Sequence, residues 1–306
     1  MVLRLHDGRR IGVAEFGTRS SLPVVYLHGF IGSRLEPGAA RIDGTNIISI
    51  DRPGYGRTDL QRLPSLCAWG ADVAEALVQL GVSECIVVGV STGAPYALAV
   101  AAALGPRVRR VILAGGIAGP EVIETAGGTA LALSMIGRRG SRTGRVLHRL
   151  LRIARATRLD RRFLARIVAS EREPLERQGL SLEVVHARLL QSFRAGNRRG
   201  LRGALADARL VAQPWDFKVA DLQAEVLILH GTNNGTKARS LALLKMPEGT
   251  ATPPADMAGV EVVGTLVIEP GQAADMALVN LPAGDYVLAD QATGATVPLK
   301  VTVPSE

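Results

Sequence analysis

A serine stands between two glycines in the segment Gly89-Val90-Ser91-Thr92-Gly93. An apolar run typical of a buried strand precedes it, and a helix of small residues is expected after it. Such glycines allow a strand to turn sharply into a helix, which holds the serine exposed for nucleophilic attack. The free amides at the start of that helix favour a developing oxyanion. The pattern predicts a nucleophile at Ser91, and an ordinary glycine-flanked turn is the alternative.

A serine nucleophile of this kind needs a general base, which is usually a histidine. The chain has five histidines, and none follows His230. We expect structural or surface roles for all of them: His6, His28, His148, His186 and His230. His186, in a helix-patterned segment, is the alternative candidate for reaching the serine.

The elements that must position Ser91 alternate between strands and helices. The helical segments are expected at 69–80 and 92–104, and the buried strands at 23–27, 46–50, 84–88, 109–114 and 224–230. This alternation is typical of an α/β fold with a doubly wound, mostly parallel sheet. The arginine-rich, helix-patterned stretch from about 117 to 213 is predicted to form a cap over the sheet.

The formal charge of +8 is concentrated in the predicted cap. A basic stretch can attract nucleic acid or an anionic membrane. Apolar residues recur there at helical spacing, however, so we expect the arginines on the solvated faces of amphipathic helices and no nucleic-acid partner. No stretch reaches the roughly 18 uncharged apolar residues that cross a bilayer. The expectation is a cytoplasmic chain without a transmembrane segment.

The composition changes near residue 237, where short segments rich in Val, Pro and Gly begin. We expect a linker at 237–258 and a small β-rich module at 259–306. Its last strands weakly resemble a fragment of a cupredoxin-like or immunoglobulin-like sandwich. A blue-copper site needs two histidines and a cysteine. This segment has neither residue type, so no metal and no cofactor are expected.

Three motifs in order resemble the α/β-hydrolase superfamily of esterase-like and lipase-like serine hydrolases. They are Leu27-His28-Gly29-Phe30, Asp51-Arg52-Pro53-Gly54-Tyr55-Gly56-Arg57-Thr58, and the turn around Ser91. The resemblance implies that the backbone amides of Phe30 and Thr92 form an oxyanion hole. It also implies that His28 and Gly29 belong to the supporting loop, and that His28 is structural.

The same resemblance places the acid of the catalytic triad at Asn234, whose amide carries no negative charge. Glu121 is the alternative acid. The family's last strand, helix and histidine have no counterpart, so the likeness covers residues 1–236. It implies a hydrolase that acts through Ser91 on ester or acyl bonds of small molecules, with impaired turnover. The alternatives are an inactive hydrolase-like binding protein and a truncated or fused remnant.

Overall fold

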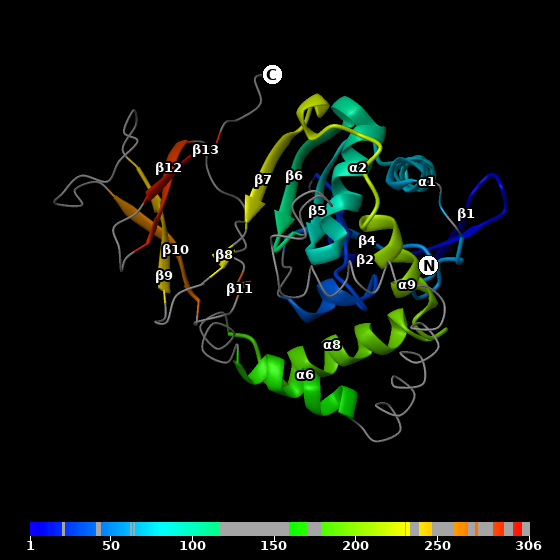
Figure 1. The fold of residues 1–306 in the computed structure, drawn as a ribbon, viewed down its shortest axis with the longest axis horizontal. Helices are drawn as coiled ribbons and strands as arrows, with labels where there is room; N and C mark the ends of the chain where they lie inside the picture. Colours follow the sequence, from blue (N-terminus) through cyan, green and yellow to red (C-terminus); the bar gives the residue numbers. More distant parts are fainter. Residues whose placement is uncertain are drawn as a thin grey trace. The chain divides into compact units, whose positions relative to one another are not determined.

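The computed structural model describes residues 1–19, 22–40, 44–61, 63, 65–116, 159–170, 179–229, 231–232, 239–246, 260–268, 273–274, 284–290 and 296–301. The chain divides into two compact units, Met1–Leu227 and Ile228–Glu306 (Figure 1).

A seven-stranded sheet with the order β1-β2-β4-β3-β5-β6-β7 forms the centre of the first unit. Its strands are β1 (Val2–Arg4), β2 (Arg10–Gly17), β3 (Val24–Leu27), β4 (Asn46–Ile50), β5 (Cys85–Val90), β6 (Val108–Ala114) and β7 (Glu225–Leu229). Strand β3 pairs in parallel with β4 and β5, and β5 pairs in parallel with β6. Strand β2 pairs antiparallel with β1 on one side and with β4 on the other. The predicted mostly parallel α/β sheet is confirmed.

Two helices pack together beside this sheet, α1 (Leu66–Gln79) and α2 (Ala94–Leu104) (Figure 1). The Ser65 side chain accepts a hydrogen bond from the Ala68 amide and so caps α1. Trp69, Val73 and Leu77 recur every four residues and are all buried in the core. This spacing presents one apolar face of α1, which explains why the segment is helical and where it packs.

Three further helices fall within the range 117–213 expected for a cap: α6 (Leu159–Ser170), α8 (Leu182–Gly196) and α9 (Arg202–Val211). Helices α6 and α8 lie beside each other at the end of the sheet toward which the arrowhead of β6 points (Figure 1). In the part of the chain that the structure describes, every helix is too short or too polar to cross a bilayer.

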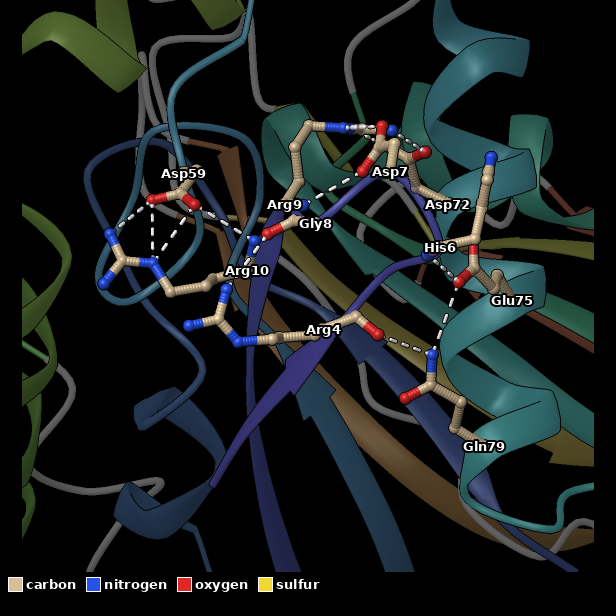
Figure 2. Close-up of polar contacts among 10 residues, drawn as sticks. All are labelled: Arg4, His6, Asp7, Gly8, Arg9, Arg10, Asp59, Asp72, Glu75 and Gln79. Atoms are coloured by element: carbon tan, nitrogen blue, oxygen red, sulfur yellow. Dashed lines mark hydrogen bonds and ion pairs between the residues drawn. The ribbon is translucent and has the colours of Figure 1, made fainter.

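Polar contacts attach the β1–β2 hairpin to α1 and to the loop after β4 (Figure 2). His6 Nδ1 lies 2.6 Å from Glu75 Oε2, and the guanidinium of Arg9 pairs with Asp72. Arg10 Nη2 donates to Asp59 Oδ1 at 2.7 Å. We call the following residues the edge cluster: His6, Arg9, Arg10, Asp59, Asp72 and Glu75.

The described part of the second unit contains strands. Four of them form an antiparallel sheet with the order β10-β9-β12-β13: β9 (Arg239–Lys245), β10 (Glu261–Ile268), β12 (Gly284–Asp290) and β13 (Thr296–Val301). The short strands β8 (Gly231–Thr232) and β11 (Ala273–Ala274) pair separately. Strand β9 thus occupies part of the expected linker 237–258. The prolines that suggested a linker all follow it, whereas its Leu244 packs into a small core with Met246 and Val287.

Candidate active site

Ser91 occupies the sharp turn between β5 and α2, with a backbone φ of 51°. A non-glycine residue rarely adopts this left-handed conformation, and such strain concentrates at functional sites. The two glycines explain how the turn closes. A Cβ on Gly89 would lie 2.7 Å from both Ala97 Cβ and the Gly93 carbonyl oxygen. A Cβ on Gly93 would collide with the Leu27 carbonyl, so neither position tolerates a side chain.

The loop after β3 lies directly against this turn. A Cβ built on Gly29 would be 3.5 Å from Ser91 Cβ, so the backbone at Gly29 is in contact range of the serine. Ile31 has a φ of 57° and, with Ser91, is one of two described non-glycine residues with positive φ. Phe30 lies between Gly29 and Ile31. The structure therefore brings the loop of His28, Gly29 and Phe30 to the turn that carries Ser91.

Within this loop, His28 is fully buried. Its Nε2 lies 3.2 Å from the Arg52 amide nitrogen and its Nδ1 lies 2.8 Å from the Gly29 carbonyl oxygen. A backbone amide only donates and a carbonyl only accepts. His28 is therefore the neutral tautomer in which Nδ1 carries the proton and Nε2 is unprotonated. Burial lowers the pKa of His28 well below its ordinary value, and the charge of Arg52 lowers it further. Both nitrogens are engaged, so His28 is structural in this geometry.

Arg52 and Asp207 form a buried ion pair next to His28. The side chains are 0% and 2% exposed, and Nη1 donates to Asp207 Oδ1 at 2.8 Å. Tyr55 donates its hydroxyl to Asp207 Oδ2 at 3.0 Å, and the guanidinium lies 4.9 Å from the ring centre of Tyr96. Burial raises the pKa of Asp207, and the charge of Arg52 opposes that shift. We call these five residues the elbow cluster: His28, Arg52, Tyr55, Tyr96 and Asp207.

The guanidinium of Arg52 also contacts both segments around Ser91. Nη2 donates to the Gly29 carbonyl oxygen at 3.0 Å and to Thr92 Oγ1 at 2.9 Å. Nη1 donates to the Thr92 carbonyl oxygen at 3.0 Å. Thr92 itself is fully buried. One cation therefore bonds to the residue after the serine and to the loop that faces the serine.

The sequence model described as "Alpha/beta hydrolase family" matches residues 24–291. The chain belongs to the alpha/beta hydrolase family. The match extends past residue 236, where the likeness of individual motifs stops.

The chain is similar to individual known proteins at low sequence identity. Over 126 residues it is 28% identical to the sn-1-specific diacylglycerol lipase ABHD11 of Xenopus laevis, a stretch that covers 40% of this chain and 38% of the lipase. The esterase RhEst1 from Rhodococcus sp. ECU1013 is similar in structure at 21% identity, with a TM-score of 0.49 and coverage of 76% and 80% of the two chains. An alpha/beta hydrolase fold protein from Nakamurella multipartita is similar at 19% identity, with a TM-score of 0.49 and coverage of 74% and 79%.

In this member of the alpha/beta hydrolase family, helix α8 reaches the loop that faces Ser91. Ser33 and Ser192 hydroxyl oxygens are 3.0 Å apart, and both are buried. Asn197, just after α8, donates from Nδ2 to the carbonyl oxygen of Ile31 at 2.7 Å. The helix expected in the cap therefore holds the residue of this loop that has left-handed backbone.

The remaining candidates lie elsewhere. Asn234, Glu121, His148 and His230 fall outside the described residues. His6 pairs with Glu75 at the surface, and His186 Nε2 lies 3.0 Å from the Arg161 carbonyl oxygen between α8 and α6. No histidine within the described ranges is hydrogen-bonded to Ser91. In those ranges, no group of three or more His, Cys, Asp or Glu is arranged to hold a metal ion.

Sequence reasoning assigns no role to four residues of the elbow cluster. Arg52 and Tyr55 stand only within the motif 51–58, and Tyr96 and Asp207 are not among the candidates. A signal was present for Asp207, because it is an acidic residue between Ala204 and Ala208, on the face of α9 that proves to be buried. A lone carboxylate on a small-residue face needs a buried partner, and Arg52 provides the matching charge.

Proposed function

We propose that Ser91 is the nucleophile of a serine hydrolase that cleaves carboxylic ester or related acyl bonds of small molecules. Ser91 Oγ attacks the carbonyl carbon, and the backbone amides of Phe30 and Thr92 hold the resulting oxyanion. The alcohol then leaves, and water releases the acyl group from the serine. The left-handed backbone of Ser91, together with a facing loop so close that a Cβ built on Gly29 would lie 3.5 Å from Ser91 Cβ, is the observation that carries this proposal.

Turnover is proposed to be slow. A serine hydroxyl is a weak nucleophile until a base removes its proton. No histidine follows His230, and position 234 holds a neutral asparagine. An oxyanion hole and substrate binding alone still accelerate such reactions by about 10³ to 10⁴ over water when triad residues are removed. We therefore expect weak esterase activity that depends on Ser91.

Covalent labelling with a fluorophosphonate, followed by intact mass measurement, tests this proposal. The wild type is expected to gain one label and to hydrolyse p-nitrophenyl butyrate faster than buffer, whereas Ser91→Ala does neither. Ser83→Ala is the matched control, because Ser83 is an exposed serine in the turn before β5. Labelling that survives in Ser91→Ala would remove Ser91 from the nucleophile role.

A hydrolase-like binding protein without catalysis is the second candidate. It is favoured by the absence of a hydrogen bond between Ser91 and any described histidine, together with the asparagine at position 234. Its signature is a wild type that unfolds cooperatively but takes up no fluorophosphonate. Such a protein would retain the turn and the facing loop as a rigid surface for a carbonyl-containing ligand.

A further inference from the structure

We propose that Arg52 is the positioning residue that keeps the two segments of the oxyanion hole at a fixed separation, and that Asp207 of helix α9 fixes Arg52. The inference deepens the proposed function, because it assigns the residues that hold the Phe30 and Thr92 amides in place. It makes Arg52 neither a nucleophile nor a base. Its role is to orient backbone groups that would contact the substrate.

The first step concerns the peptide unit between Gly29 and Phe30. Its carbonyl oxygen accepts one hydrogen bond from Arg52 Nη2 at 3.0 Å and another from His28 Nδ1 at 2.8 Å. A peptide unit is planar and trans, so its C=O and N–H point in opposite directions. Holding the Gly29 oxygen from one side therefore sets the direction of the Phe30 N–H on the other side. The cation also polarises this peptide and makes its N–H a stronger donor.

The second step concerns the residue after the nucleophile. The Thr92 carbonyl oxygen accepts from Arg52 Nη1 at 3.0 Å, and Thr92 Oγ1 accepts from Nη2 at 2.9 Å. The guanidinium is a rigid planar fork, so the spacing between its donors does not vary. Because the same fork holds Thr92 and the Gly29 carbonyl, it sets the distance between the two segments. A lysine has a single ammonium on a flexible stem and cannot reproduce this.

The third step concerns the anchor of Arg52 itself. Asp207 Oδ1 accepts from Nη1 at 2.8 Å, and the Tyr55 hydroxyl holds Asp207 Oδ2 at 3.0 Å. The pair is shielded from water, so the guanidinium has few alternative orientations. Asp207 lies 155 positions after Arg52, on a helix expected in the cap. The cap region thereby contributes to the geometry of the oxyanion hole through a buried carboxylate.

Arg52→Lys is the principal test, with Arg34→Lys as its matched control. Arg34 is also buried and donates from Nη1 to Asp51 Oδ2 at 2.7 Å, so both variants disturb a buried arginine–aspartate pair. Arg34 has no hydrogen bond to Gly29 or Thr92. For p-nitrophenyl butyrate we expect kcat of Arg52→Lys to fall about 10²-fold with KM within about twofold, the signature of lost transition-state geometry. Arg34→Lys is expected to keep kcat within about threefold.

Equal losses of kcat in the two lysine variants would show that any buried ion pair matters alike and would overturn the proposal. Asp207→Asn is the second variant, with an expected decrease in kcat of about tenfold, because the amide still accepts a hydrogen bond from Arg52. It keeps the test decisive if Arg52→Lys does not fold. An unchanged kcat in folded Asp207→Asn would contradict the role of the carboxylate as anchor.

Amide hydrogen exchange measured by mass spectrometry separates this inference from the proposed function. Peptides that span 89–94 and 27–32 are expected to exchange faster in Arg52→Lys than in the wild type, and the 89–94 peptide is expected to be unchanged in Arg34→Lys. This readout needs no activity. If the wild type proves inactive, the proposed function fails, while exchange still decides whether Arg52 holds the loops. Unchanged exchange in both peptides of Arg52→Lys would overturn the inference.

Discussion

The elbow cluster and the edge cluster each contain an arginine–aspartate pair, and these two pairs differ in their exposure to water. Arg52 and Asp207 are 0% and 2% exposed, whereas Arg10 and Asp59 are 45% and 28% exposed. Away from water, charges interact strongly and a charge that loses its partner is costly. At the surface, water and salt weaken the same pair to about 0 to 1 kcal/mol. The buried pair can therefore fix backbone geometry, while the exposed Arg10–Asp59 pair attaches the β1–β2 hairpin to the loop after β4.

The largest expected effect comes from breaking the buried pair on one side. Asp207→Ala leaves the Arg52 guanidinium buried without a countercharge, so we expect a loss of about 3 to 5 kcal/mol in the free energy of unfolding. Urea denaturation followed by tryptophan fluorescence measures it. A loss below about 1 kcal/mol would mean that water reaches Arg52 and that the two clusters do not differ.

Removing both charges together separates stability from positioning. Replacing a buried ion pair with apolar residues of similar volume is often neutral or stabilising. The double variant Arg52→Met/Asp207→Leu is therefore expected to recover most of the stability lost in Asp207→Ala. It has no donors for Gly29 and Thr92, so its kcat stays about 10²-fold below wild type. Recovery of both stability and kcat would show that the buried pair does not position the oxyanion hole.

The turn at Ser91 and the elbow cluster differ in how far the sequence could predict them. The signals for the turn at Ser91 lie close to it in the sequence, so the glycines and flanking apolar runs predict it. The partners of Arg52 cannot be found this way, because Asp207 is 155 positions away and its place depends on the docking of α9. Charged residues are also expected at the surface by default. The arginine-rich composition around α9 favoured that expectation.

The same contrast between local and distant signals applies to strand β9 of the second unit. Strand β9 pairs with residues 261–268 and with 284–290, and neither partner is adjacent to it in sequence. Its apolar stretch, read alone, is short and precedes several prolines. Strand β9 therefore lies within the range 237–258, which the sequence alone predicts to be a linker. Tertiary pairing determined the structure of this segment more than its own pattern.

A smaller effect is expected where the edge cluster is exposed. Hydrogen bonding to Arg10 lowers the pKa of Asp59 from 3.8 to about 2. A carboxylate with a lowered pKa stabilises the fold above its unfolded pKa and loses this contribution as pH falls through the folded value. We expect Asp59→Asn to cost about 1 kcal/mol or less at pH 6. The difference from wild type should shrink between pH 4 and pH 2 and also in high salt. A pH-independent difference would assign the effect to packing.

The smallest expected effect compares the two histidines, His6 of the edge cluster and His28 of the elbow cluster. Glu75 raises the pKa of the exposed His6 through a hydrogen bond, whereas burial and Arg52 lower the pKa of His28. The stabilisation from His6 is thus present below pH 6.5 and is lost as pH rises through the raised pKa. In an NMR titration, the pKa of His6 is expected to lie above 6.5 and to return toward 6.5 in Glu75→Gln. His28 is expected to stay neutral over the pH range in which His6 titrates. The two surroundings shift the pKa of an imidazole in opposite directions. A His28 that titrates together with His6 would therefore mean that water enters the elbow cluster.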